Sequence, residues 1–230
     1  LVDGGAPTGA SPGAAAQLDG GHFRVPGIDM NSQIRDAGDG SYTMTAWIKP
    51  SALDGERFLF GQTSQGIHHG IRNNGFLHSA HWGADWNSNT NLGDYTPPEN
   101  QNGWLHAAWV YDGSSDTAKM YLDGVLDGTL SQRAPNGGGY LIFGARNNGE
   151  AQYRGLVDEV AIWDKAISES EILKLAKGGS PVASLSDADK DGFIDAWEKK
   201  YAGNLTDLDG NNEEADFDKD GLTDAEEYKL

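Results

Sequence analysis

Short runs of β-forming residues, separated by Gly, Asn and Asp, occupy the chain from Leu18 to Trp163. Such runs, with turn residues between them, are typical of antiparallel sandwiches and barrels. Asn74-Gly75 predicts a two-residue hairpin turn, and Asp123-Gly124 predicts another. We therefore expect an all-β fold, a two-sheet antiparallel jelly-roll sandwich. The predicted strands are Tyr42–Ile48, Arg57–Phe60, Gly66–Arg72, Phe76–Trp82, Leu105–Tyr111, Ala118–Leu122, Tyr140–Gly144 and Leu156–Trp163.

One short helix is predicted to follow the last of these strands. Ser168 and Glu171 have the spacing of a capping box, and Ile172 and Leu175 continue with helical periodicity. Gly178-Gly179 is expected to end the helix. We expect the following organisation: a linker or trimmed start at 1–13, where no signal peptide is visible, a sandwich with its helix at 14–179, a linker at 180–186 and a small loop-helix module at 187–230.

The charge of the chain excludes some classes of partner. The formal net charge is −18, whereas nucleic acids and anionic membrane surfaces are bound by basic faces. No stretch is long and apolar enough to span a membrane, and the absence of cysteine excludes disulfides and thiolate metal sites. Acidic residues are concentrated in 187–230, so this tail should repel itself unless cations neutralise it.

Two segments of the tail fit the EF-hand calcium-loop template. Each has carboxylates at loop positions 1, 3, 5 and 9, Gly at position 6 and Glu at position 12, which together offer the oxygen ligands that calcium prefers. We expect a short helix after each loop, and the alternative is a solvated acidic tail. The predicted calcium ligands are Asp187, Asp189, Asp191, Asp195, Glu198, Asp216, Asp218, Asp220, Asp224 and Glu227, with backbone carbonyls of Phe193 and Leu222.

The residues of both regions resemble known families. The tail resembles dockerins and the thrombospondin type 3-like repeats of bacterial surface proteins. Segments Ser41–Pro50, Trp104–Gly113, Met120–Val125 and Gly155–Ile172 resemble, in order, strands of laminin G-like, concanavalin A-like lectin jelly rolls. This second resemblance implies glycan or protein binding on a rigid sandwich. It also implies a calcium ion held by Asp19 and Asp158. The alternative is that Asp19 serves a turn and Asp158 lies on a surface strand, without a metal.

A histidine-rich stretch is the candidate ligand surface. If Asn74-Gly75 forms the hairpin turn, His68 pairs with His81, and Arg72 and Ser79 lie on the same side. Two cross-strand histidines could instead hold a transition metal, or the stretch could be a polar strand face without a ligand. Asp85 and Trp86 are expected in the following loop. The predicted ligand-binding residues are His68, His69, His78, His81, Trp82, Asp85 and Trp86.

Motifs for catalysis are weak in this chain. It lacks the alternating acidic residues that jelly-roll glucanases place on one strand, and the HExxH, P-loop and Rossmann motifs are absent. We expect a non-catalytic, calcium-dependent carbohydrate-binding module of a secreted or cell-surface bacterial protein with further domains. Its ligand would be a glycan or a glycoprotein. The alternatives are an adhesive protein-binding spacer and a glycoside hydrolase with an unrecognised acid pair.

Overall fold

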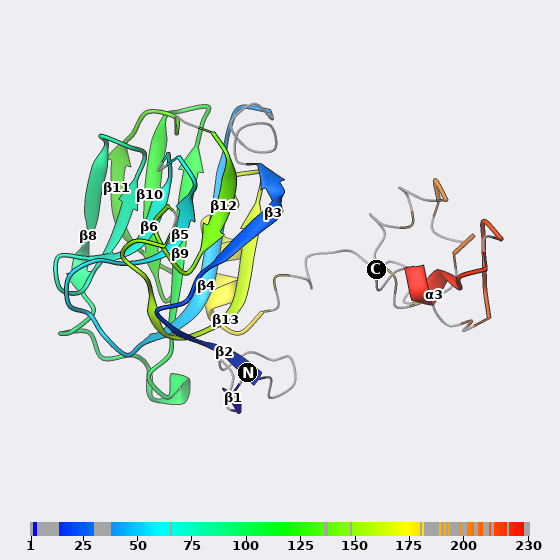
Figure 1. Cartoon of the computed structure of the whole chain (residues 1–230), viewed down its shortest axis with the longest axis horizontal. Coiled ribbons are helices and arrows are strands. Elements are labelled where there is room, and N and C mark those ends of the chain that lie inside the picture. Colours follow the sequence, from blue (N-terminus) through cyan, green and yellow to red (C-terminus); the bar gives the residue numbers. More distant parts are fainter. Residues whose placement is uncertain are drawn as a thin grey trace. The chain divides into compact units, whose positions relative to one another are not determined.

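The chain forms two compact units, Leu1–Ser180 and Pro181–Leu230, in a computed structural model (Figure 1). The first unit is a β-sandwich and the second is the acidic tail. The structure describes residues 2–3, 14–29, 38–64, 66–135, 138–147, 149–179, 181, 189, 191, 193, 198, 202–204, 207–208, 212, 214–219 and 221–227.

The described part of the sandwich is built almost entirely from antiparallel strands. Its elements are β1 (Val2–Asp3), β2 (Ala14–Asp19), β3 (Phe23–Asp29), β4 (Tyr42–Pro50), β5 (Arg57–Gln62), β6 (His68–Arg72), β7 (Phe76–Ala80), β8 (Asp85–Asn91), the 3-10 turn η2 (Glu99–Gln101), β9 (Leu105–Asp112), β10 (Thr117–Leu122), β11 (Val125–Ser131), β12 (Tyr140–Phe143), β13 (Arg154–Trp163) and helix α1 (Glu169–Ala176).

These strands form two sheets that pack face to face. One sheet has the order β1-β2-β13-β4-β9-β10-β11, and the other has the order β3-β12-β5-β6-β7-β8. The main core lies between them, because apolar side chains alternate toward the facing sheet along each strand. Its buried members include Met44, Ile48, Trp109, Leu59, Ile71 and Leu77. The predicted all-β sandwich is confirmed, although β1, β2, β3, β8 and β11 lie outside the predicted runs.

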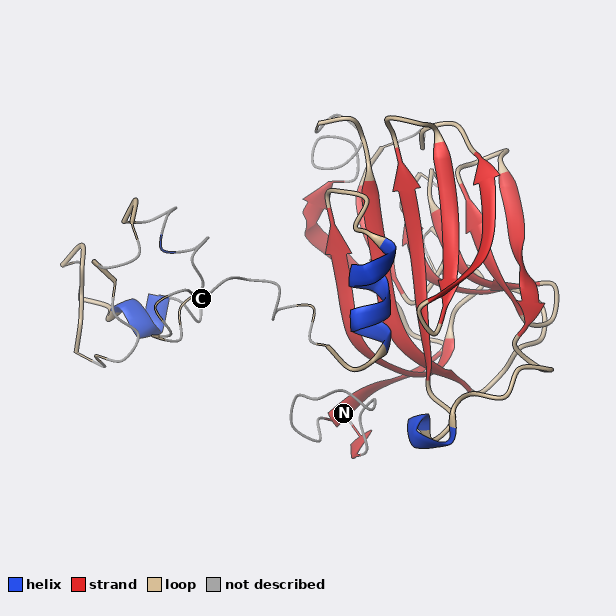
Figure 2. Ribbon diagram, turned by 180° about the vertical axis from the view of Figure 1, so that it is seen from behind, coloured by secondary structure: helices blue, strands red, loops and turns tan. Residues whose placement is uncertain are grey.

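Helix α1 covers part of the outer face of the seven-stranded sheet (Figure 2). Ser168 caps it by accepting a hydrogen bond from the Glu171 backbone, and the Glu171 side chain returns a bond to the Ser168 backbone, so the predicted capping box is confirmed. Ile172 and Leu175 pack on Val110 and its neighbours in this sheet. The outer face of the six-stranded sheet carries no such helix among the described residues.

The hairpin between β6 and β7 differs from its prediction by one residue. Arg72 pairs with Phe76, so three residues, Asn73, Asn74 and Gly75, form the turn, and all three have positive φ. The expected two-residue turn at Asn74-Gly75 is therefore wrong. The second predicted turn, Asp123-Gly124, is confirmed, because Leu122 pairs with Val125 across it.

The register of this hairpin changes which histidines share a face. His81 bridges to Ile67, so the predicted pairing of His68 with His81 is wrong. A shift of one residue exchanges the two faces of a strand. Ser79 and His81 consequently face the buried side with Ile67, and His78 joins His68 on the outer face.

In the second unit, the structure describes short pieces of both acidic loops and one helix, α3 (Asp224–Glu227). Phe193 and Leu208 are its buried apolar residues among those described. Across the described residues of both units, no helix has the length and apolar character needed to cross a membrane.

Candidate functional site

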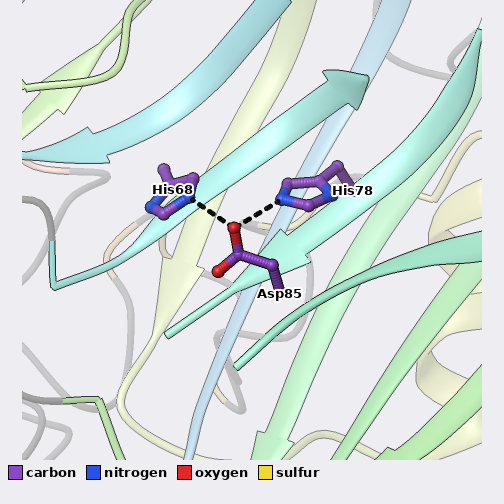
Figure 3. Close-up of side chains that lie close together, drawn as sticks. All are labelled: His68, His78 and Asp85. Carbon is purple, nitrogen blue, oxygen red and sulfur yellow. Dashed lines mark ion pairs between the residues drawn. The ribbon is translucent and has the colours of Figure 1, made fainter. Parts of the chain in front are cut away.

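The outer face of the β6–β7–β8 segment brings two histidines and a carboxylate together. His68 and His78 point outward because their neighbours along each strand enter the core, and Asp85 reaches them from the start of β8. Asp85 Oδ2 lies 3.7 Å from His68 Nε2 and 3.9 Å from His78 Nε2. Figure 3 shows this carboxylate oxygen between the two imidazole rings. Both histidine side chains are buried, whereas that of Asp85 is 35% exposed.

The proton of His78 is placed by its hydrogen bonds. Its Nδ1 lies 2.7 Å from Asn87 Oδ1, and an amide oxygen only accepts, so the Nδ1–H donates and Nε2 keeps its lone pair. The Nε2 atom faces Asp85, and Arg72 Nη1 lies 3.4 Å from it. Burial lowers the pKa of His78 to about 4, so the ring is neutral at pH 7.

A chain of ion pairs extends this cluster across the face. Arg72 contacts Asp85 at 2.9 Å and Glu56 at 2.8 Å, and Glu56 contacts Arg146 at 3.2 Å. Arg146 also contacts Glu150 at 3.1 Å. Negative and positive charges therefore alternate along this series of ion pairs, and most of these side chains are partly exposed. Such a face offers both donors and acceptors to a polar ligand.

The inner face of the same hairpin carries a second histidine pair. His69 Nε2 and His81 Nε2 lie 2.8 and 2.5 Å from the Tyr42 hydroxyl. His69 Nδ1 accepts from the Ala80 backbone, so its Nε2–H donates to Tyr42, the hydroxyl donates to His81, and His81 Nδ1–H donates to the Arg133 carbonyl. Burial lowers the pKa of both rings, that of His81 to about 4. These two predicted ligand-binding residues lie in the core.

The two predicted tryptophans lie in different surroundings. Trp82 is 53% exposed in the turn between β7 and β8. Trp86 belongs to β8, not to a loop as predicted, and it packs against the main core close to Gly128. Trp82 is therefore available to a ligand, whereas Trp86 supports the sandwich.

Main-chain atoms anchor the turn that carries Trp82. The Trp82 N–H donates to the Gly66 carbonyl at 3.1 Å, and the Trp82 carbonyl accepts from the Arg133 guanidinium. Gln132 donates to the Ala84 carbonyl at 2.5 Å. The anchors come from two other segments of the chain, before β6 and after β11.

The structure does not bring Asp19 and Asp158 together. Asp19 pairs with Arg154, and Asp158 lies four residues further along β13, a separation of about 13 Å at roughly 3.3 Å per residue. That distance is too long for the two carboxylates to share one ion. Asp158 Oδ1 accepts a hydrogen bond from the Glu159 backbone. The calcium pair implied by the resemblance is therefore not assembled.

Three predicted ligands of the first acidic loop converge. Oxygen atoms of Asp189, Asp191 and Glu198 all lie within 4.8 Å of one another, and Glu198 is 0% exposed. Asp191 Oδ1 also accepts from the backbone of the buried Phe193 at 2.9 Å. Burying a carboxylate is costly unless a cation or donors compensate it, so this arrangement fits an oxygen-ligated cation. The remaining predicted ligands, Asp187 and Asp195, lie outside the described residues.

In the second loop, two predicted ligands shape the described backbone. Asp216 accepts from the Lys219 and Gly221 N–H groups at 2.7 and 3.1 Å. Asp224 is buried, its Oδ1 accepts from Phe217 at 2.8 Å, and its Oδ2 has no hydrogen-bond partner. A buried oxygen without a donor fits a cation ligand. Asp218 and Leu222 are exposed, and Asp220 and the Glu227 side chain lie outside the description.

Sequence reasoning did not find Glu56, Asn87 or Arg146. Asn87 follows Asp85 at a spacing of two, which would have placed both on one face had β8 been recognised as a strand. Glu56 precedes β5 and Arg146 follows β12, and nothing in the sequence places these separated residues side by side.

Comparison with family models gives one match over the sandwich. Residues 22–173 match the model described as the concanavalin A-like lectin/glucanases superfamily. Among curated proteins, no sequence matches the chain.

Solved structures with a similar fold include several from carbohydrate-active proteins. Domain 4 of the extracellular arabinanase AbnA from Geobacillus stearothermophilus, in complex with arabinotriose, is 23% identical, with a TM-score of 0.51 over 73% of this chain and 78% of that domain. The sialidase CBM40 from Ruminococcus gnavus, bound to α2,3 sialyllactose, is 14% identical, with a TM-score of 0.54 over 70% and 96%. The Streptococcus pneumoniae sialidase NanB is 18% identical, with a TM-score of 0.53 over 75% of this chain and only 28% of its own.

Proposed function

Because the chain belongs to the concanavalin A-like lectin/glucanases superfamily, we propose that its sandwich is a carbohydrate-binding domain. We assign the ligand surface to the outer face of the six-stranded sheet beside Trp82. One observation carries this assignment. Arg72 and Asp85 form a partly exposed ion pair, and the turn just before Asp85 in the sequence carries Trp82, which is 53% exposed. The complexes of similar domains with arabinotriose and sialyllactose support a glycan ligand.

The chemistry of this surface suits a sugar. An exposed indole ring can stack on the apolar C–H face of a pyranose or furanose, while charged side chains hydrogen-bond hydroxyl groups. Arg72 and Asp85 supply a donor and an acceptor 2.9 Å apart, which is the spacing that neighbouring hydroxyls can meet. The ligand would lie across β7 and β8, with its ring against Trp82.

The experiment is a titration of the full chain with oligosaccharides, beginning with arabinotriose and sialyllactose and extending to a glycan array. Trp82→Ala should weaken binding by about 1–3 kcal/mol, the scale of a lost stacking face. Phe23→Ala is the matched control, because Phe23 is a 60% exposed aromatic on β3 at the opposite edge of the same sheet. The proposal fails if no glycan binds, or if Trp82→Ala and Asp85→Ala both bind as tightly as the parent.

The same experiment separates binding from catalysis. The proposal is of a non-catalytic module, so the bound oligosaccharide should be recovered intact. Release of reducing sugar from any member of the panel would indicate a glycoside hydrolase instead. We also propose a secreted or cell-surface location, since millimolar extracellular calcium would saturate weak acidic loops.

For the tail, we propose two calcium sites. The converging oxygens of Asp189, Asp191 and Glu198 support the first, and the buried Oδ2 of Asp224 supports the second. Calcium supplied to these loops would neutralise their charge and stabilise the folded tail.

Calorimetry of the full chain should show two calcium ions bound per chain. The double substitution of Asp191→Ala with Asp224→Ala, which removes both side-chain oxygens at each position, should abolish both sites, while Asp54→Ala, in the sandwich, should change neither. Unchanged stoichiometry in the double variant would refute the assignment. Repeating the glycan titration in EDTA measures whether sugar binding also requires the ion.

A further inference from the structure

We propose that His68, His78 and Asp85 form a binding site for a divalent transition metal ion of the zinc class. This site is separate from the calcium loops and does not depend on a glycan. Imidazole nitrogen and carboxylate oxygen are the ligands that such ions take in proteins, whereas calcium takes oxygen. The three side chains come from three consecutive strands, which fix their positions (Figure 3).

The distances are close to those of a loaded site. Ligand atoms 2.0–2.1 Å from a tetrahedral ion lie about 3.3 Å from one another. His68 Nε2 and His78 Nε2 lie 3.7 and 3.9 Å from Asp85 Oδ2, and all three ligand atoms lie within 4.8 Å of one another. Small side-chain rotations would therefore close the shell. The Asp85 side chain is 35% exposed, so solvent reaches the carboxylate that would bind the ion.

The surroundings of His78 prepare it as a ligand. Metal-binding histidines usually donate their second ring nitrogen to an oxygen acceptor, which fixes the tautomer and the ring orientation. The Nδ1–H of His78 donates to Asn87 Oδ1 at 2.7 Å and leaves the Nε2 lone pair toward Asp85. The Phe58 ring contacts both imidazoles in T-shaped pairs, and its centroid lies 5.2 Å from that of His68 and 5.7 Å from that of His78. These contacts limit the movement of both rings.

Arg72 is the competitor of the metal ion. Its Nη1 lies 2.9 Å from Asp85 Oδ2 and 3.4 Å from His78 Nε2, so it occupies the two acceptors that a metal would take. Its Nε also contacts Glu56 at 2.8 Å, and this partner would remain when a metal claims Asp85. The geometry therefore predicts exchange between a guanidinium and a metal ion at one carboxylate.

The probe is Co²⁺, titrated into the full chain in the presence of saturating Ca²⁺. Tetrahedral cobalt with nitrogen ligands absorbs visible light strongly, whereas octahedral cobalt on oxygen ligands absorbs weakly, so the tail loops contribute little. We expect one equivalent of strongly absorbing Co²⁺ per chain. One equivalent of Zn²⁺ should displace it.

Four variants assign the site. Asp85→Asn and His78→Gln should each lower the apparent Co²⁺ affinity at least tenfold and remove the strong band. Arg72→Gln should raise the affinity, because it removes the competing cation. His22→Gln is the control, since His22 is an exposed histidine elsewhere on the sandwich. Circular dichroism tests whether each variant is folded. If His78→Gln does not fold, the result for Asp85→Asn alone tests the proposal.

Absence of a strong band in the parent chain, or its persistence in Asp85→Asn, would overturn the proposal. No glycan enters this experiment, and Trp82→Ala should bind Co²⁺ as the parent does. Failure of the metal site therefore leaves the carbohydrate proposal standing, and loss of glycan binding alone leaves the metal site standing.

Discussion

The hairpin of β6 and β7 carries histidine pairs on both of its faces, and the two pairs differ in chemistry. On the inner face, His69 and His81 are joined by Tyr42 into a directed series of hydrogen bonds that ends at a backbone carbonyl. On the outer face, His68 and His78 lie around a partly exposed carboxylate at distances longer than a hydrogen bond. The same residue type serves once between the two sheets and once on the outer face of a sheet.

Under the proposed metal site, burial alone would not distinguish a structural histidine from a metal ligand. All four rings are buried. The inner pair is separated from solvent by the packed sheets and satisfied by protein atoms, so it has no capacity for a ligand. The outer pair points toward Asp85 and Arg72, both accessible to water, and can exchange these partners for others. The predictions below test this contrast, beginning with the largest effect.

Acidification should destabilise the sandwich through both pairs. Burial lowers the pKa of His78 and His81 to about 4, against about 6.5 in the unfolded chain, and also lowers that of His69. The unfolded chain therefore binds more protons, so stability is full above pH 6.5 and is lost as pH falls toward 4. At about 1.4 kcal/mol per pKa unit, His78 and His81 alone account for a loss on the order of 5 kcal/mol by pH 4.5. His69 and the buried His106, whose pKa burial lowers to about 3, add to this loss.

Urea unfolding followed by near-ultraviolet circular dichroism at pH 7, 6, 5 and 4.5 measures this loss. The calcium concentration is held constant throughout. A free energy of unfolding that stays flat between pH 7 and 5 would contradict the neutral state of these histidines in the folded protein.

Removing the Tyr42 hydroxyl tests the inner pair. Tyr42→Phe leaves the His69 N–H without its acceptor and the His81 nitrogen without its donor, and each buried orphan costs about 1–3 kcal/mol. We expect a loss of about 2–4 kcal/mol in the free energy of unfolding at pH 7. Tyr140→Phe, on the half-buried Tyr140 of β12, should stay within about 0.5 kcal/mol of the parent. Equal effects of the two substitutions would show that the hydrogen bonds of Tyr42 with His69 and His81 do not contribute to the free energy of unfolding.

Asn87→Ala tests how strongly the outer pair depends on its support. The His78 Nδ1–H would lose its acceptor, but it lies closer to solvent than the inner rings, so we expect a loss of about 1–2 kcal/mol in thermal or urea unfolding. A loss as large as that of Tyr42→Phe would mean that the outer pair is also structural.

The smallest effect is expected for Arg72→Gln. Ion pairs between partly exposed side chains contribute about 0–1 kcal/mol, because water screens them. Arg72 should therefore matter to ligands and little to the free energy of unfolding. Destabilisation by more than about 2 kcal/mol in urea would assign Arg72 to the scaffold.

Much of the fold could be predicted from local sequence. Strands with alternating apolar residues, such as β4 and β9, were predicted within a few residues of their ends. Strand β8 was not, because Asp85–Asn91 consists mostly of Asn, Ser, Thr and Asp, which are typical of turns. It becomes a strand because β7 offers it a free edge, which is a tertiary effect.

The candidate site was predictable in composition but not in arrangement. The histidine-rich stretch was recognised, yet Asn73 also entered the turn, and this single residue moved His81 and Ser79 to the inner face. Either Asn-rich turn was compatible with the local sequence. The choice depends on which register buries Leu77 between the sheets, and that requires the facing sheet.

The turn that carries Trp82 has a consequence for how recognition could diversify. Its hydrogen bonds use the main chain of Trp82 and Ala84, and the partners lie on Gly66, Gln132 and Arg133. The side chain at position 82 takes no part in holding the turn. A library randomised at this one codon should therefore yield folded proteins for every residue except proline, which lacks the N–H that bonds the Gly66 carbonyl. Selection could then retune ligand preference without a search for compensating mutations.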